Sequence, residues 1–459
     1  GMALPASSDS AHTWSSEIVF ILAAIGAAVG LGNIWKFPND VGDSGGGAFV
    51  LVYLLCVDII ALPTLSAERP LGRRRGHRPP VATRMVAEDS GRSKARTIVG
   101  WMGVIAGFLI ATYYSVIAGW TLAYIIKAAT GFGGSTMAEV AQQFEELKDS
   151  PATMTLWHTV FMLISVFIVG RGLHGGIERT VKVLMPALFV MLLVMIGYAM
   201  VAGDLKAGLE FLFSTDFSKI TPNTVLVAIG QAFFSIGVAI GLMMAYGSYV
   251  PKNISLTKAA VIIASADTLI AILAGIMIFP IVFANGLDPA EGPGLIFTTL
   301  PTAFASMPGG QIFGALFFLL LAFAGLTSII AIIEPIIRYA EDKWAMSRVK
   351  ACFIFGFIGW AIGMLSVFSF NIWAHIRPLG MFEVFGEMTF FGLIDYFTAN
   401  ILMPLGGILI AVFVGWRLRK EHLDNELVFP SPVVAQAWLF LIRFAAPIAI
   451  LLVLISSLR

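Results

Sequence analysis

Charge is scarce in this sequence. Of its 459 residues only 12% are Asp, Glu, Lys or Arg, whereas 58% are hydrophobic, and the mean hydropathy is +0.88. Soluble domains are about one quarter charged, so the composition excludes an ordinary soluble protein and predicts a polytopic membrane protein. Too little of the chain lies outside apolar stretches to form a second soluble domain. We therefore expect one transmembrane domain over residues 1–459.

Cysteine and catalytic motifs are scarce as well. The two cysteines, Cys56 and Cys352, lie in apolar segments without disulfide or metal-site spacing, which indicates buried side chains and no redox chemistry. The histidines, His158 among them, lie in loops or at the ends of apolar segments, and HExxH and GxSxG patterns are absent. A membrane-embedded enzyme would need such a constellation. A Walker A sequence is absent too, so ATP is not the expected energy source.

The apolar residues form eleven segments that can each cross a bilayer, since a spanning helix needs about 20 mostly apolar residues. These segments lie near residues 17–40, 46–68, 98–128, 156–171, 179–202, 224–248, 256–286, 310–342, 350–370, 389–418 and 433–458. The residues before the first segment lack the basic region and cleavage site of a signal peptide, so this segment is expected to remain in the protein.

Charges between the segments predict the orientation. The loop from Arg69 to Arg96 is strongly basic, and the positive-inside rule places it in the cytoplasm together with the N-terminus. The loop from Gly131 to Pro151 is acidic and is expected outside. An odd number of spans in the plasma (inner) membrane then places the C-terminus outside. Binding of nucleic acid or anionic lipid by the arginine cluster stays open as an alternative.

Two apolar segments are interrupted by glycine and polar residues. The first reads GAAVGLGNIWKFP from Gly26 to Pro38, and the sixth reads FFSIGVAIG from Phe233 to Gly241. In hydrocarbon a helix break survives only where protein, ion or substrate satisfies the freed backbone groups. Paired breaks are typical of inverted-repeat secondary transporters, whose site lies at the bilayer midplane. For the sixth segment, close helix packing through small residues is the alternative.

Three polar side chains lie deep in other apolar segments. The hydroxyls of Thr327 and Ser328 either bond to the preceding turn or serve, with carbonyls near Gly26 and Val29, as oxygen ligands for a hard cation such as Na⁺. Asp267 lies halfway along its segment, where an ionised carboxylate costs roughly 3 kcal/mol or more and is functional by default. A bound cation offsets that cost. A neutral, protonated acid is the alternative.

Five motifs together resemble the bacterial amino-acid branch of the neurotransmitter:sodium symporter family. They are GAAVGLGNIWKFP, DSGGGAF at Asp43–Phe49, YYSVIAGW at Tyr113–Trp120, GQAFFSIGVAIG at Gly230–Gly241 and AGLTS at Ala324–Ser328. The resemblance extends over nearly the whole chain. It implies an all-α fold with breaks in helices 1 and 6, in which residues 17–202 and 224–418 form inverted repeats of five helices each and residues 433–458 add one more.

The resemblance also implies two sodium sites. For the first, the implied ligands are the substrate carboxylate together with Ala28, Asn33, Ser235 and Asp267. For the second, they are Gly26, Val29, Ala324, Thr327 and Ser328.

By the same resemblance, the substrate carboxylate meets backbone amides of the first break and the Tyr114 hydroxyl, because the N-terminus of a half-helix favours an anion. Carbonyls of the sixth-segment break hold the ammonium. Gly30 stands where monoamine carriers have an aspartate, so an amino acid is the expected cargo, and the apolar lining suits a neutral hydrophobic one. The residues implied around it are Ala28, Gly30, Leu31, Gly32, Ile110, Tyr114, Phe234, Ser235, Gly237, Ile240, Ser328 and Ile332.

Several residues resemble the closing elements of the family. Phe234 and Tyr114 correspond to the lid over the substrate, and Lys36 and Asp395 to the charged pair outside it. Asp342 and Trp14 correspond to the inner gate. The stretch from Gly176 to Pro186 corresponds to a fifth-helix element whose unwinding admits water; an ordinary helix start with a proline kink is the alternative.

The inner gate departs from the family pattern. Relatives carry an arginine shortly before the tryptophan, whereas this chain has Ala11 and His12 there, and Glu17 replaces a second family arginine. The arginine that pairs with the counterpart of Asp342 in relatives is therefore missing from this sequence.

The chloride pocket departs as well. Tyr53, Gln231 and Ser235 keep the family pattern, but Asp267 replaces an asparagine and Ala271 replaces a serine. We infer that the Asp267 carboxylate supplies the negative charge that chloride brings elsewhere, so transport is expected to be chloride-independent.

The expected mechanism is alternating access driven by the sodium gradient. Proton coupling or sodium/proton antiport through Asp267 is the alternative. A channel would need an uninterrupted polar pore, whereas here the polar groups gather at the midplane.

Overall fold

The computed structural model describes residues 14–31, 34, 37–44, 46–56, 97–134, 136–214, 218, 220–222, 224–225, 227–228, 256–290, 294–383 and 385–402. Every regular element in these residues is helical, in agreement with the all-α prediction. The second half of the second predicted span, most of the sixth, more than half of the tenth and all of the eleventh lie outside them. The count of eleven spans and the inverted repeat therefore stay predictions.

Six described helices are long and apolar enough to cross a membrane. They are α7 (Thr97–Ala129), α9 (Pro151–Gly170), α10 (Arg179–Ala202), α14 (Leu256–Ala284), α16 (Gly310–Lys343) and α17 (Arg348–Ser369). Each coincides with a predicted span within a few residues. The largest difference is α9, which was predicted to begin at residue 156 and begins at Pro151. Its start is set by the Ser150 hydroxyl, which accepts a hydrogen bond from the Thr153 N–H, and by a proline in the first turn.

Shorter helices connect and flank these spans. They are α2 (Glu17–Leu31), α3 (Phe37–Asp43), α4 (Gly47–Cys56), η4 (Gly131–Gly133), α8 (Met137–Asp149), η5 (Leu173–Glu178), α11 (Leu205–Phe213), η7 (Leu295–Thr299), α15 (Leu300–Ser306), α18 (Phe390–Asp395) and η8 (Tyr396–Leu402).

The interpretation of residues 131–151 as a loop was wrong in one respect, because most of this acidic connection is α8. The Thr136 hydroxyl caps the helix by accepting from the Glu139 N–H. Val140, Phe144 and Leu147 are buried at helical spacing, so the acidic residues occupy the other face.

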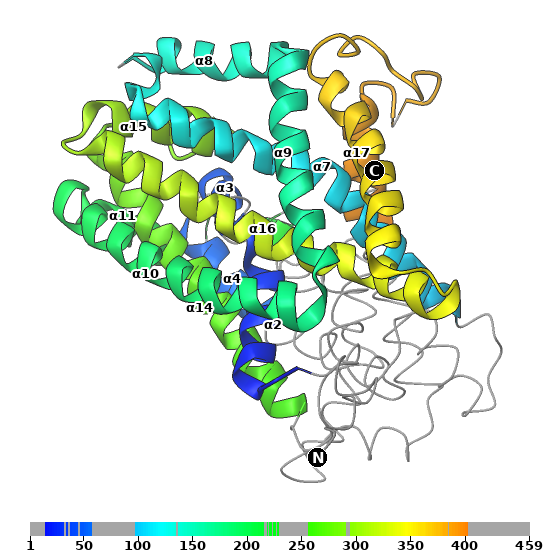
Figure 1. Cartoon of the computed structure of the whole chain (residues 1–459). Coiled ribbons are helices and arrows are strands. Elements are labelled where there is room, and N and C mark those ends of the chain that lie inside the picture. Colours follow the sequence, from blue (N-terminus) through cyan, green and yellow to red (C-terminus); the bar gives the residue numbers. More distant parts are fainter. Residues whose placement is uncertain are drawn as a thin grey trace.

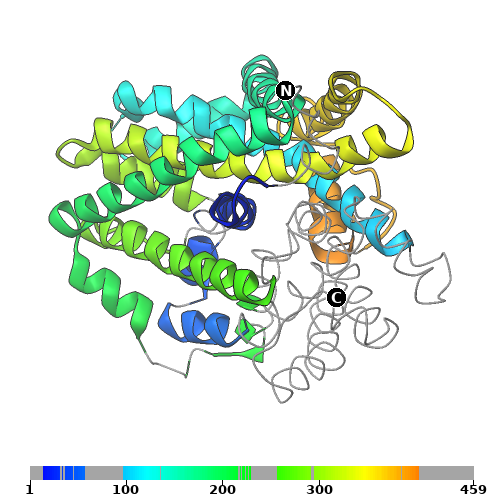
Figure 2. The same cartoon turned by 60° about the horizontal axis from the view of Figure 1, so that its bottom comes forward.

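The arrangement places α2 in the middle of the bundle. Figure 2 shows α2 nearly end-on, with α16 on one side and α14 on the other. Helix α16 packs along α7 and against α2, while α9 and α17 pack on the outside of α7, and α10 and α11 pack on α14. The acidic α8 lies at one end of the bundle, and the α16–α17 connection lies at the opposite end (Figure 1).

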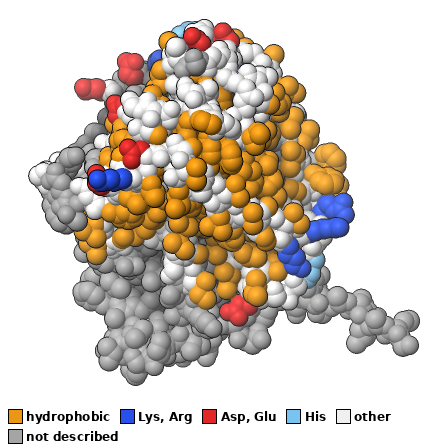
Figure 3. All heavy atoms as spheres, turned by 90° about the vertical axis from the view of Figure 1, so that its left-hand side faces the viewer, with side chains coloured by type: hydrophobic (Ala, Val, Ile, Leu, Met, Phe, Trp, Pro, Cys, Tyr) orange, Lys and Arg blue, Asp and Glu red, His pale blue; other side chains and the backbone are white. Residues whose placement is uncertain are grey.

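The outer surface is apolar. A space-filling view shows a broad belt of hydrophobic side chains with the charged ones near its edges (Figure 3). Helix α10 alone exposes Val183, Val190, Leu193 and Val201. Such a surface is stable in contact with lipid.

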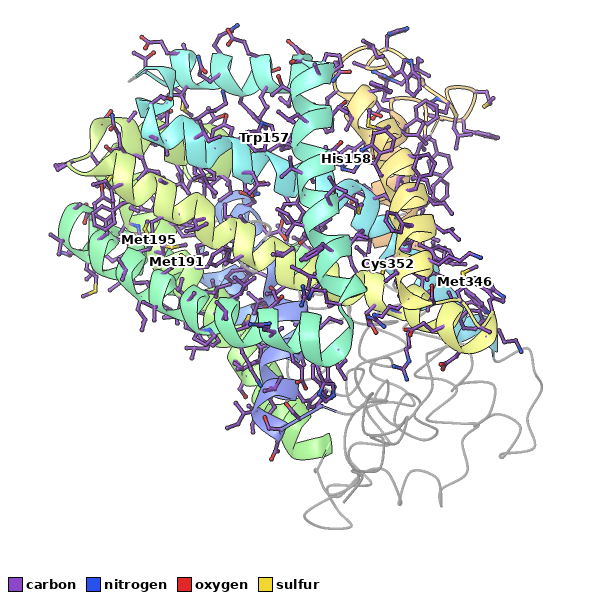
Figure 4. All side chains as sticks on the ribbon, viewed as in Figure 1. Trp157, His158, Met191, Met195, Met346 and Cys352 are labelled. Atoms are coloured by element: carbon purple, nitrogen blue, oxygen red, sulfur yellow. The ribbon has the colours of Figure 1, made fainter. Side chains whose placement is uncertain are left out.

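His158 connects three of the spans and does not lie at a span end as the sequence suggested. It is wholly buried within α9, where Figure 4 labels it beside Trp157. Its Nε2 lies 3.0 Å from the Trp360 carbonyl oxygen of α17, and its Nδ1 lies 2.9 Å from Oγ of Ser115 on α7. A carbonyl only accepts, so Nε2 carries a proton and donates it to the Trp360 carbonyl. The position is structural.

Candidate functional site

Helix α2 breaks at Gly30. This residue has φ 34° and ψ −153° inside an otherwise helical stretch, in the place where the sequence predicted an interruption. The position requires glycine for a second reason, since a β-carbon on Gly30 would lie 1.9 Å from Oγ of Ser328. The break frees carbonyl groups of the preceding turn in the middle of the bundle. Leu31 ends α2, and Gly32 and Asn33 lie outside the described residues.

Two hydroxyls of α16 meet these carbonyls. Oγ1 of Thr327 donates to the Gly26 carbonyl at 3.1 Å and to the Ala324 carbonyl at 3.0 Å. Oγ of Ser328 lies 3.2 Å from the Gly26 oxygen and 3.1 Å from the Ala27 oxygen. Five oxygens are thus gathered between α2 and α16, and we call this group the oxygen cluster. Both hydroxyls are buried, with side chains 2% and 3% exposed.

The oxygen cluster contains hard, uncharged donors, the type that a small alkali cation prefers. Four of the five residues predicted for the second sodium site each contribute an oxygen atom to this cluster, namely Gly26, Ala324, Thr327 and Ser328. The fifth, Val29, is buried on α2 close by. Ala27, which sequence reasoning missed, supplies a carbonyl, and only its position next to Gly26 could have suggested it.

Helix α10 closes the oxygen cluster from a third side. A β-carbon on Gly26 would lie 3.0 Å from Sδ of Met185 and 3.0 Å from Cβ of Thr327. Met185 is wholly buried and directly precedes Pro186, which lies inside α10. Sequence reasoning had named Pro186 but not Met185. The proline removes one helical hydrogen bond next to the contact with α2.

The described part of the predicted substrate lining lies on α2, α7 and α16. Ile110, Tyr114 and Ile332 are buried with exposed fractions of 0%, 6% and 3%. A β-carbon on Gly107 would lie 3.6 Å from Cβ of Ile332, so α7 and α16 are in close contact at this level. Ala28 is buried on α2. Phe234, Ser235, Gly237 and Ile240 lie outside the described residues, and so does Gln231.

Asp267 is wholly buried within α14, which packs against α2 and α10. Ala271 follows one turn later and is equally buried, so no hydroxyl stands in this position. Tyr53 of α4 is also buried, with its ring 4.7 Å from that of Phe37.

Only one residue of the predicted outer charged pair, Asp395, lies in the part of the chain that the structure describes. Asp395 ends α18, which packs against α7. The Tyr113 ring contacts Phe391 of α18 edge-on at 5.6 Å. Lys36, the predicted partner of Asp395, lies outside the described residues.

At the opposite end, α10 begins with a π-helical turn, η5. Gly176 sits in this turn, and a β-carbon there would lie 2.0 Å from the Ile168 carbonyl oxygen of α9. Trp14 is buried against Phe20, with ring centroids 6.1 Å apart. Asp342 lies on the last turn of α16, 4.0 Å from Nε of Arg338.

Comparison with known proteins identifies the family. The model of the sodium:neurotransmitter symporter family matches residues 11–138 and 131–459. The chain belongs to this family. The symporter is 35% identical to a sodium-dependent transporter of Bacillus subtilis, YhdH, over 96% of this chain and 97% of that protein. It is 33% identical to a sodium-dependent transporter of Haemophilus influenzae, over 97% and 98% of the two chains.

A crystal structure of MhsT in complex with L-phenylalanine is similar over almost the whole chain. The TM-score is 0.87 at 40% sequence identity, over 97% of this chain and 99% of that one. The family assignment makes this protein a sodium-dependent membrane transporter, and it agrees with the resemblance that the sequence motifs predicted.

Proposed function

We propose that this protein imports a neutral, hydrophobic L-amino acid together with sodium ions by alternating access. The observation that carries the proposal is the oxygen cluster, where Thr327 and Ser328 of α16 meet the Gly26 carbonyl of α2 just before the break at Gly30. A cation bound there would hold α2 and α16 together, which couples ion binding to the arrangement of two central helices.

A second ion is assigned to Asp267. A wholly buried carboxylate on a membrane helix needs a compensating charge, and α14 packs directly on α2. The substrate carboxylate would complete this site, with Asn33 and Ser235 as further ligands. Affinities for substrate and sodium would then be reciprocally coupled.

The substrate class rests on the lining and on MhsT. Ile110 and Ile332 are buried apolar side chains on two packed helices, and Gly30 leaves no acidic side chain to meet a substrate amine. MhsT, which is 40% identical, was solved with L-phenylalanine. Both support a neutral hydrophobic amino acid.

The orientation proposed is an inner-membrane protein with a cytoplasmic N-terminus and an extracytoplasmic C-terminus. It is supported by the acidic α8 at one end of the bundle and by the basic residues of the connections at the other, including Arg171 and Arg348 (Figure 1).

The test begins with purified protein in sodium or potassium buffer and each of the twenty amino acids. A ligand that binds only the folded protein raises its melting temperature, so hydrophobic amino acids should do so in sodium alone. Saturable uptake into proteoliposomes along an imposed sodium gradient should follow. Equal stabilisation in potassium would contradict sodium coupling. Uptake that needs a proton gradient would favour the alternative use of Asp267.

A further inference from the structure

Ser15, two residues before α2, is hydrogen-bonded to Glu178, the residue directly before α10. The backbone N–H of Ser15 donates to Oε1 of Glu178 at 2.7 Å, and its hydroxyl donates to Oε2 at 2.9 Å. Both oxygens of one carboxylate therefore hold one residue, and charge-assisted hydrogen bonds of this length are among the stronger ones in proteins. We call this pair of bonds the Ser15–Glu178 clamp.

The clamp lies between two packed elements. Trp14, next to Ser15, is 2% exposed and rests on Phe20 of α2. Glu178 is also 2% exposed and is the last residue of η5. This π-helical turn packs closely against α9 at Gly176. The clamp thus joins the beginning of α2 to the turn that begins α10. Nδ1 of His174, in the same turn, lies 3.9 Å from Oε2 of Glu178.

The family pattern places a different bond here, between an arginine of the N-terminal segment and Asp342. Residues 1–13 contain neither lysine nor arginine, and Ala11 and His12 stand where relatives carry the arginine. Arg338, one turn earlier on α16, brings its Nε to 4.0 Å from Asp342. The end of α16 thus has a cation of its own beside Asp342.

Two other carboxylates of this end of α16, Glu334 and Glu341, also pair with a nearby arginine. Arg348, at the start of α17, donates to Glu334 and to Glu341 and also to the Val169 carbonyl of α9. These bonds connect α16, α17 and α9 with one another.

We propose that the Ser15–Glu178 clamp is the bond that closes the intracellular side of this symporter, in place of a salt bridge between the N-terminal segment and Asp342. When the clamp is intact, Trp14 covers Phe20 and η5 is held against the start of α2. When it opens, the N-terminal segment and the first turn of α10 separate. The inference rests on the proposed transport cycle, but its test needs no substrate.

The test measures the exposure of the α2 face beneath Trp14. Ala24 lies one helical turn after Phe20 on the same face and is wholly buried. Ala24→Cys is introduced into a chain with Cys56→Ala and Cys352→Ala, and its reaction with a maleimide is timed in sodium. Adding Glu178→Gln should speed the reaction about tenfold, the usual effect of removing one charge-assisted hydrogen bond. Ser15→Ala, which keeps the backbone bond, should give a smaller increase.

Asp342→Asn is the decisive comparison and should change the rate less than twofold. A larger effect of Asp342→Asn than of Glu178→Gln would overturn the proposal, and so would unchanged rates in both clamp variants. Glu145→Gln, the same chemical change on α8 at the far end, is the control. Ser15 is exposed, so Ser15→Ala decides the matter if Glu178→Gln fails to fold. If the proposed amino-acid substrate were wrong, the thermal stabilisation with amino acids would show it, whereas the maleimide reaction rates of Ala24→Cys would not change.

Discussion

Gly26 on α2 and Met185 on α10 pack so closely that a β-carbon on Gly26 would lie 3.0 Å from the Met185 sulfur. The same β-carbon would lie 3.0 Å from Cβ of Thr327. Helices α2, α10 and α16 can therefore pack this closely only because residue 26 has no side chain. Since the Gly26 carbonyl accepts from both hydroxyls of the oxygen cluster, any displacement of Gly26 displaces that cluster as well.

Gly26→Ala should therefore weaken sodium binding. Overpacking a tight contact costs about 1–3 kcal/mol, which corresponds to a loss of affinity of roughly tenfold if the helices separate slightly. The measurement is the sodium dependence of thermal stabilisation. Gly197→Ala on α10 is the matched control, because a β-carbon there meets no atom within 4 Å. An unchanged sodium dependence in Gly26→Ala would show that the cluster does not bind the ion.

Thr327→Val removes one oxygen from the cluster and keeps the shape of the side chain. Sodium affinity should fall by about tenfold or more, because the other oxygens would be left to coordinate the ion without this ligand. Thr327→Ser retains the hydroxyl and should stay within a few fold of the parent. Equilibrium binding of radiolabelled sodium distinguishes them. If valine and serine behaved alike, the hydroxyl would not be a ligand.

Asp267→Asn should lower sodium affinity and make uptake respond to chloride. The substitution removes the buried negative charge that we assign to the first sodium site, and an added anion could then supply it. Uptake is measured in proteoliposomes with chloride or gluconate. Uptake that equals that of the parent and stays indifferent to chloride would reject the assignment of Asp267.

Gly176→Ala should destabilise the protein, whereas Gly175→Ala should not. A β-carbon at residue 176 would lie 2.0 Å from the Ile168 carbonyl oxygen, so η5 has to move away from α9, at a cost of about 1–3 kcal/mol. A β-carbon at residue 175 meets nothing within 4 Å. Thermal melting in detergent compares these neighbours. Equal melting temperatures would mean that η5 does not require glycine at residue 176.

The parts of the site whose residues are close together in the sequence could be predicted. The break at Gly30 was predictable because two glycines interrupt an apolar run, and Thr327 and Ser328 because two hydroxyls in hydrocarbon need partners. Met185 could not be foreseen, since any apolar side chain suits that pattern and only helix packing brings it to Gly26. The same holds for the Ser15–Glu178 clamp, whose partners are 163 residues apart. Helix α8 was missed because its charges outweighed its short apolar face.

The π-helical turn η5 has a geometric consequence for everything that follows it. Such a turn holds one residue more than an α-helical turn, and each residue of an α-helix corresponds to about 100° of rotation. If η5 rewound into an α-helical turn, the extra residue would have to be accommodated in the rest of the helix. Helix α10 would then rotate about its own axis by about 100°. Met185 would then face away from Gly26, and a different side chain would stand beside the oxygen cluster.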